Sequence, residues 1–243
     1  MRDLIALLER YAPGYSSQIQ GASTWDLDNL EEAFGQPLPD VYRDFARKMG
    51  ENGGPLLAHV SVNDLLDVAD IYRIKRPAAP PRRFLFVFGD PDPLTRFHYW
   101  LDLEAPSEEG DFQVVQFPLI QDAWKTKLQQ SYVSFREMLY LWAMGNVHLP
   151  SFPHRALYHQ GDRKRTTAEE FAQYLGKMGF VRLPYPRYSM LFERDDAAVR
   201  LYRPPDSPHH FEFRVGMHSP DKLKHFLAVI EDNTDVKKSI WKP

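Results

Sequence analysis

The sequence predicts an α+β protein with two domains, each built from helices and an antiparallel sheet. Three strand-like runs separated only by short turns indicate an antiparallel meander in the first domain. Segments with helical periodicity lie before and after these runs. Near the carboxyl end, a helix, four short strand-like runs and another helix indicate a second α+β unit. We therefore expect an antiparallel sheet flanked by helices over residues 1–148 and a small α+β domain over residues 149–243.

Helical signals dominate the first part of the chain. Residues 3–11 are amphipathic, and Ser23 or Thr24 can cap a second helix whose apolar stripe ends at Gly35. A proline-rich corner follows, and Asp40 begins a third helix. A fourth, shorter helix is expected to run towards Tyr72.

The strands of the first domain are rich in aromatic residues. The run Phe84–Phe88 is continuously apolar, which predicts a strand covered on both faces. Helical periodicity returns at residue 133 and ends at Gly145. The strands of this domain are expected at 56–60, Phe84–Phe88, 97–103 and 112–117.

Residues 150–165 are rich in proline, histidine and arginine, so we expect no regular structure there and place the domain boundary in this segment. Thr167 and Glu170 form the pattern of a capping box, and Gly179 is expected to end the helix that this box opens. Ser219 followed by Pro220 predicts the start of the last helix. The intervening strands are expected at 181–183, 189–193, 198–202 and 211–215.

The 243 residues include no cysteine, which excludes disulfides, thiol catalysis and cysteine zinc sites. The first ten residues are too short and too charged for a signal peptide. Every apolar run is shorter than the roughly 18 residues that a membrane span needs. These features predict a cytoplasmic protein with no membrane partner.

Charge is divided unevenly along the chain. Residues 1–149 carry 21 acidic and 14 basic side chains, a net charge of −7, whereas residues 150–243 have a net charge of +4. An acidic domain favours encounter with a basic protein partner. The same sign disfavours direct binding of nucleic acid. The alternative is that the two domains differ in charge without any functional consequence.

Catalytic signatures are missing from the sequence. It contains no glycine-rich phosphate loop, no dinucleotide-binding fingerprint, no G-x-S-x-G elbow, no H-E-x-x-H helix and no kinase motif. We therefore predict a protein that is not an enzyme, with no catalytic residue and no cofactor.

Six carboxylates fall in the two turns of the predicted meander. Paired carboxylates can hydrolyse glycosides, but exposed carboxylates keep ordinary pKa values that do not suit an acid catalyst at neutral pH. We interpret them as an acidic rim that faces a protein partner, and solvated turns are the alternative. The residues are Asp90, Asp92, Glu104, Glu108, Glu109 and Asp111.

Two further clusters have weaker functional interpretations. The segment from His209 to Glu212 is the nearest approach to a metal site: on a strand His210 and Glu212 would lie on one face, and a third ligand would have to come from His218 or Asp206. A solvated loop that leads into a strand is the favoured explanation. The basic run 163–165 precedes the expected start of a helix. It would either bind a phosphate or an acidic partner, or increase the solubility of the protein.

Several ordered motifs resemble the SMI1/KNR4 family, also called the SUKH superfamily. The similarity extends over residues 23–145, including the aromatic strands and the closing segment 134–139. The segment 89–93 departs from the family, which more often has a glycine-richer turn there, and residues 150–243 match no assignable pattern. The opening motifs are Leu27-x-x-Leu30-Glu31-x-x-Phe34-Gly35, Leu38-Pro39-x-x-Tyr42-Arg43-x-Phe45 and Asn52-Gly53-Gly54.

The resemblance implies a protein that binds another protein. Bacterial members look like immunity proteins that neutralise a cognate polymorphic toxin, often a nuclease, whereas fungal members regulate cell-wall synthesis and signalling. The long flanking segments of the fungal members are missing here, which favours the bacterial type. The alternatives are an adaptor for an endogenous protein and a metal-assisted hydrolase centred on His209, His210 and Glu212.

Overall fold

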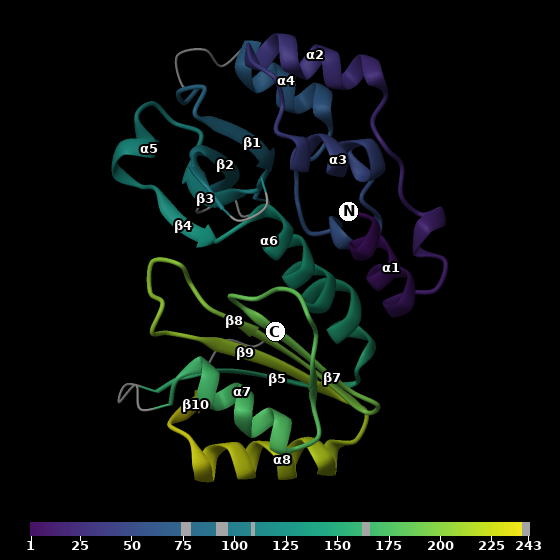
Figure 1. Cartoon of the computed structure of the whole chain (residues 1–243), viewed down its shortest axis with the longest axis vertical. Coiled ribbons are helices and arrows are strands. Elements are labelled where there is room, and N and C mark those ends of the chain that lie inside the picture. Colours follow the sequence, from purple (N-terminus) through teal and green to yellow (C-terminus); the bar gives the residue numbers. More distant parts are fainter. Residues whose placement is uncertain (74–78, 91–96, 108–109, 162–165, 240–243) are drawn as a thin grey trace. The chain divides into compact units, whose positions relative to one another are not determined.

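The computed structural model describes residues 1–73, 79–90, 97–107, 110–161 and 166–239 (Figure 1). The chain divides into two compact units, unit 1 over Met1–Leu139 and unit 2 over Tyr140–Pro243. Unit 1 contains a four-stranded sheet and unit 2 a six-stranded sheet, and both are antiparallel and accompanied by helices. The predicted α+β class is therefore confirmed. The division falls inside α6 (Phe135–Trp142), earlier than the predicted boundary after residue 148.

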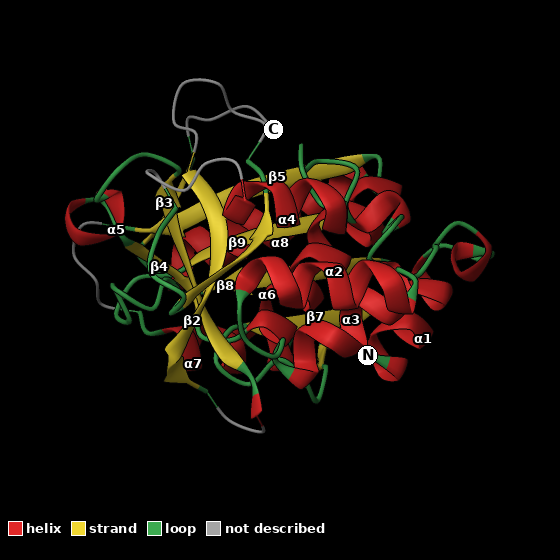
Figure 2. Ribbon diagram, turned by 90° about the horizontal axis from the view of Figure 1, so that it is seen from above, coloured by secondary structure: helices red, strands yellow, loops and turns green. Residues whose placement is uncertain are grey.

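Unit 1 begins with four helices and continues into its sheet, whose strands follow the order β1-β2-β3-β4. Figure 2 shows its strands strongly twisted, as the right-handed twist of extended chains requires. Before the sheet come α1 (Arg2–Tyr11), α2 (Thr24–Phe34), α3 (Asp40–Met49) and α4 (Leu65–Arg73), with 3-10 turns at Tyr15–Ser17 and Gly54–Leu56. The sheet contains β1 (Phe84–Phe88), β2 (Phe97–Pro106), β3 (Phe112–Pro118) and β4 (Gln129–Tyr132), and a short helix, α5 (Ala123–Thr126), precedes β4.

The motif residue Glu31 holds the corner between α2 and α3 together. Its carboxylate accepts a hydrogen bond from the backbone N–H of Leu38, at 2.8 Å, and forms an ion pair with the Arg43 guanidinium. Gly35 ends α2 with a φ of +81°, a conformation that favours glycine. These contacts give a structural reason for the spacing of Glu31, Gly35, Leu38 and Arg43 in the first two motifs.

The third motif, Asn52-Gly53-Gly54, is hydrogen-bonded to the segment between α1 and α2. The buried hydroxyl of Tyr15 donates a 2.6 Å hydrogen bond to the Gly53 carbonyl oxygen. The backbone N–H of Gly54 donates to Oδ1 of Asn52 at 2.8 Å, which forms a tight turn of the kind that asparagine favours. All three motifs therefore stabilise the scaffold.

Strand β1 is an edge strand whose outer side is covered by α4. The hydroxyl of Tyr72 donates to the Phe84 carbonyl oxygen at 3.0 Å and accepts from the Phe86 N–H at 2.6 Å. A side chain thus takes the place of a neighbouring strand and satisfies backbone groups that would otherwise be exposed at the edge. All residues of β1 are buried, so the predicted coverage of both faces is confirmed.

Two local predictions for unit 1 need correction. The expected strand at 56–60 is wrong, because the chain forms the 3-10 turn Gly54–Leu56 there. Gly54 has a φ of +58° and Pro55 has no N–H to donate to a ladder, so this stretch turns despite its apolar composition. Strand β4 was not expected, since Gln129 and Gln130 give it a polar composition.

Unit 2 has the sheet order β10-β5-β9-β8-β7-β6. After α6 the chain continues through a π-helical turn at Ala143–His148 and a 3-10 turn at Leu149–Ser151. The other elements are β5 (His154–Gln160), α7 (Ala168–Lys177), β6 (Val181–Arg182), β7 (Met190–Arg194), β8 (Ala197–Tyr202), β9 (Glu212–Met217), α8 (Pro220–Asn233) and β10 (Val236–Lys238).

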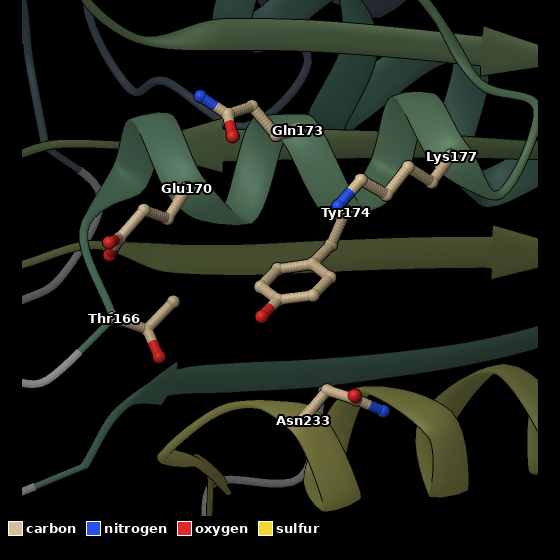
Figure 3. A pocket seen from close by; sticks show the side chains of 6 residues that line it. All are labelled: Thr166, Glu170, Gln173, Tyr174, Lys177 and Asn233. Carbon is tan, nitrogen blue, oxygen red and sulfur yellow. The ribbon is translucent and has the colours of Figure 1, made fainter.

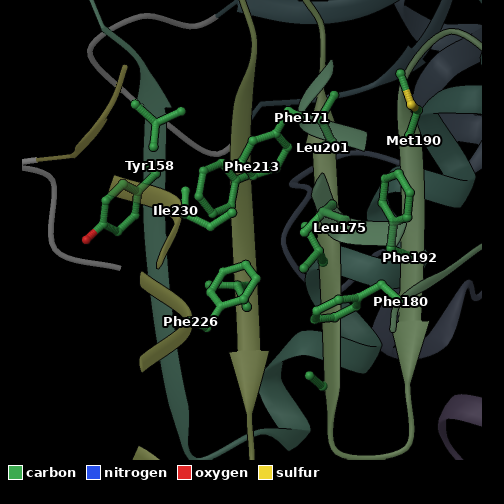
Figure 4. Close-up of a cluster of buried hydrophobic side chains, with 14 of the residues drawn as sticks. Tyr158, Phe171, Leu175, Phe180, Met190, Phe192, Leu201, Phe213, Phe226 and Ile230 are labelled. Carbon is green, nitrogen blue, oxygen red and sulfur yellow. The ribbon is translucent and has the colours of Figure 1, made fainter. Parts of the chain in front are cut away.

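The core of unit 2 lies between α7, α8 and one face of the sheet (Figure 4). Phe171 of α7 contacts Phe213 of β9 with ring centroids 4.5 Å apart, and Phe226 of α8 contacts Phe180 at 5.8 Å. The capping box of Thr167 and Glu170 and the N-cap of Ser219 are both present, so the predicted starts of the two helices are confirmed.

Two strands of unit 2 lie where the sequence predicted none. Strand β5 falls in the segment that we expected to lack regular structure, and it pairs with β9, for example Ala156 with Val215. Strand β10 then adds to the other side of β5, with Val236 opposite Gln160. Both pairings join residues that are far apart in the sequence, so the local composition of each strand does not predict them.

The turn between β7 and β8 provides a pH-dependent contribution to stability. A hydrogen bond from Lys222 at 2.7 Å and one from Arg194 at 2.6 Å lower the pKa of Asp196 to about 2. A lowered pKa in the folded state means that the contribution is present above pH 4 and is lost as the pH falls towards 2. We expect Asp196→Asn to cost about 1–2 kcal/mol at pH 7.

Urea unfolding of both proteins at a series of pH values tests this prediction. The difference between wild type and Asp196→Asn should shrink as the pH falls from 4 towards 2. Asp195→Asn is the matched control, because Asp195 lies in the same turn but is exposed and has no ion pair among the described residues. A difference that does not change with pH would contradict the assignment.

Candidate functional site

The structure places the predicted acidic turn residues in different environments. Asp90 follows β1 and is half-buried, and its backbone N–H donates to Nδ1 of His98 at 3.3 Å. Glu104 is exposed on β2 and forms an ion pair with Arg83 at 3.1 Å. Three more of the predicted turn residues, Asp92, Glu108 and Glu109, lie outside the described residues.

Asp111 is not on an exposed turn, so that expectation is wrong. Its side chain is buried and only 2 % of the residue is exposed. The carboxylate accepts hydrogen bonds from the backbone N–H groups of Phe112, Phe135 and Arg136 at 2.7, 3.1 and 2.9 Å. Burial raises the pKa of Asp111, and these donors oppose that shift. The residue caps the start of α6, whose first N–H groups have no partner within the helix.

A cavity of about 320 Å³ opens between α4 and the sheet of unit 1. Its wall is largely apolar and reaches the core, since Ile71 is 6 % and Phe86 only 1 % exposed. The ring of His98 packs against Phe86 with centroids 5.5 Å apart. The lining residues are Val62, Asp67, Asp70, Ile71, Phe86, His98 and Leu119.

Two carboxylates mark the helical side of this cavity. Asp67 and Asp70 lie three residues apart on α4, a spacing that puts both on one side of the helix, and both are exposed. Neither forms an ion pair with another residue in the described part of the chain. We call the cavity together with these two carboxylates the α4 site.

The sequence contains one indication of the α4 site, which is the position of two aspartates within a helical pattern and not the overall composition. Asp67 and Asp70 alternate with the buried residues Val68, Ala69 and Ile71 of the same helix. Within a predicted helix this pattern identifies an acidic outer stripe, whereas the contribution of Phe86, His98 and Leu119 depends on the tertiary fold. The acidic character expected for unit 1 is thus present on α4 as well as near the predicted turns.

The structure gives no support to a metal centre at the predicted histidines. Among the described residues, no three histidine, aspartate or glutamate side chains are grouped closely enough to hold a metal ion. Glu212 instead pairs with Nη2 of Arg200 at 3.1 Å, and His209 is exposed. The basic run 163–165 lies outside the described residues.

Comparisons with known proteins neither extend nor restrict these observations. A scan against protein-family models and a search of curated proteins both found no match for this chain. In the parts of the chain that the structure describes, no helix combines the length and the apolar character needed to cross a membrane.

Proposed function

We propose that this chain is a non-enzymatic, cytoplasmic binding protein that neutralises a basic bacterial toxin, in the manner of SMI1/KNR4-type immunity proteins. The observation that carries the proposal is the α4 site, where Asp67 and Asp70 flank an apolar cavity without an ion-pair partner among the described residues. The net charge of −7 in residues 1–149 extends the same preference for a basic partner over the whole unit.

The two parts of the α4 site have different roles in this proposal. An apolar side chain of the toxin enters the cavity against Phe86 and Leu119, and full burial of such a side chain stabilises by about 1.5–3 kcal/mol. Lysine or arginine side chains beside it meet Asp67 and Asp70. Exposed ion pairs add little affinity, but they raise the association rate and exclude acidic partners. Inhibition follows when the bound protein covers the toxin's substrate-binding surface.

The resemblance to the SMI1/KNR4 family supports the proposal through the scaffold. Glu31, Gly35 and the Asn52–Gly54 turn have the structural roles described above, and none of them lies at the α4 site. Because these motifs stabilise a corner and a turn elsewhere, the residues on the outer face of α4 can differ from one partner to another without loss of the scaffold. This arrangement suits a family whose members each recognise a different toxin.

Charge reversal at the α4 site tests the proposal. The toxin encoded beside this gene is expected to arrest growth, and co-expression of this protein should restore it. We expect Asp67→Lys with Asp70→Lys to weaken the complex by about 100-fold, because two attractive contacts become repulsive. Isothermal titration calorimetry at several salt concentrations measures the affinity, and the wild-type affinity should fall as salt increases.

A matched control separates a local effect from the change in net charge. Asp28→Lys with Glu32→Lys makes the same charge change on the exposed side of α2. This variant should bind within about threefold of wild type at physiological salt, because neither Asp28 nor Glu32 lines the α4 cavity. Equal loss in both variants would remove the α4 site from the proposal. Absence of both rescue and complex, with capture of a housekeeping protein from the native cell, would favour an endogenous adaptor instead.

A further inference from the structure

A second cavity, of about 380 Å³, lies in unit 2 between α7 and the last turn of α8 (Figure 3). The ring of Tyr174 projects from α7 into the space between the helices, and Asn233 of α8 lies across from it. Thr166 and Glu170 are at one end. All its lining residues carry polar groups: Thr166, Glu170, Gln173, Tyr174, Lys177 and Asn233.

Three hydrogen bonds hold Thr166 at its end of the cavity. The Thr166 N–H donates to Asp235 Oδ1 at 3.2 Å, and the Asp235 N–H donates to Thr166 Oγ1 at 3.4 Å. Nε2 of Gln160 donates to the Thr166 carbonyl oxygen at 2.7 Å. This bond fixes the orientation of the Gln160 amide. Its Oε1 is buried and accepts no hydrogen bond from any residue that the structure describes, and only 5 % of the residue is exposed. A buried acceptor without a donor beside a polar cavity is unusual in a folded protein.

Other polar groups around the cavity are also available. The Tyr174 hydroxyl and the Gln173 amide form no hydrogen bond with another described residue. Asn233 uses its Nδ2 to donate to the Val229 carbonyl oxygen at 2.7 Å, which leaves its amide oxygen as an acceptor. Glu170 uses one carboxylate oxygen in the capping box of α7. The cavity therefore offers both donors and acceptors to a ligand.

The charges restrict the class of ligand. The Glu170 carboxylate is held in place at the start of α7 and disfavours phosphates and other anions. Lys177, whose Nζ lies 5.5 Å from the centre of the Tyr174 ring, disfavours cations. The polar lining disfavours apolar molecules, because its groups would lose water without gaining partners. A neutral molecule with several hydroxyl groups meets all three conditions.

We propose that the cavity between α7 and α8 binds a small uncharged polyol of the size of a monosaccharide or disaccharide. Its hydroxyl groups donate to Glu170 and to the Asn233 amide oxygen, and they accept from the Lys177 ammonium and the Tyr174 hydroxyl. The volume is equivalent to about a dozen water molecules, which accommodates one or two sugar rings. This site is independent of the toxin-binding role proposed for unit 1.

Nuclear magnetic resonance titration of the ¹⁵N-labelled full chain tests the proposal. The probes are D-glucose, N-acetyl-D-glucosamine and myo-inositol, with inorganic phosphate as the anionic comparison. We expect at least one polyol to shift the amide signals of Thr166, α7 and Asn233 in a saturable manner with a millimolar Kd, and phosphate to leave them unchanged. The proposal is overturned if no polyol shifts these signals, or if phosphate shifts them as strongly.

Two variants separate binding from folding. Tyr174→Phe removes only the hydroxyl and keeps the ring, which packs against the core, so the fold should persist while the Kd for the polyol increases about threefold to tenfold. Lys177→Ala should have a similar effect. Lys224→Ala is the matched control, since Lys224 is exposed on α8 and outside the cavity. Equal affinities for Tyr174→Phe, Lys177→Ala and Lys224→Ala would show that the polyol binds elsewhere.

Discussion

Replacing Phe45 by alanine is expected to lower the free energy of unfolding by about 4 kcal/mol. Phe45 is 1 % exposed, and its ring lies 5.6 Å from the Phe88 ring and 5.2 Å from the Phe135 ring, both in edge-on geometry. It therefore joins α3 to β1 and to α6 within unit 1. The loss combines the transfer energy of a large side chain with the cost of the cavity that remains.

Urea unfolding followed by tryptophan fluorescence measures this loss, because Trp100 is buried in the same unit. Phe45→Leu keeps most of the volume and should cost about half as much. Trp25→Ala is the control for removing an aromatic ring from the surface, since Trp25 is 65 % exposed, and it should change stability by less than about 1 kcal/mol. A loss below about 2 kcal/mol in Phe45→Ala would contradict the central role of this ring.

Helix ends in this chain are predictable because single residues determine them. Ser23 and Asp26 form a reciprocal capping box at the start of α2, and Thr167 and Glu170 do the same for α7. Gly35 ends α2 through its left-handed conformation. In each case the interaction spans only a few residues, so the sequence contains both partners.

Strands that form through distant pairing are less predictable. Strand β5 contains His154, Arg155 and His159, residues that resemble a polar loop, yet it is paired on both sides within a six-stranded sheet, next to the edge strand β10. Its partner β9 is more than fifty residues away, and β10 joins it from near the carboxyl end. The energy that makes these residues extended comes from pairing and burial in the tertiary structure.

The candidate site shows the same limit. The acidic charge of residues 1–149 follows from counting, but the sequence does not show which carboxylates face solvent. Asp102 is 3 % exposed because Nε and Nη2 of Arg83 each donate to it at 2.6 Å, whereas Asp67 and Asp70 remain exposed beside the α4 cavity. The sequence does not distinguish a surface aspartate from an interior one, because burial and hydrogen-bond partners both depend on the tertiary structure.

The distinction is sharpest at Asp111, where we expect alanine to lower the free energy of unfolding by about 3 kcal/mol. The substitution removes the acceptor for three backbone N–H groups, those of Phe112, Phe135 and Arg136. The bond from Phe135 is buried and the other two are part-buried, so water replaces the carboxylate only incompletely. The loss should therefore exceed that of an ordinary exposed helix cap.

Urea unfolding of a small set of variants tests this role. Asp111→Asn keeps one acceptor oxygen and should lose about 1 kcal/mol, and Glu104→Ala, which removes an exposed carboxylate from β2, should lose less than about 1 kcal/mol. If Asp111→Ala were as stable as Glu104→Ala, the capping role would be wrong. If it were destabilised yet bound the toxin with wild-type affinity while folded, Asp111 would belong to the scaffold and Asp67 and Asp70 would remain the acidic residues to test at the interface.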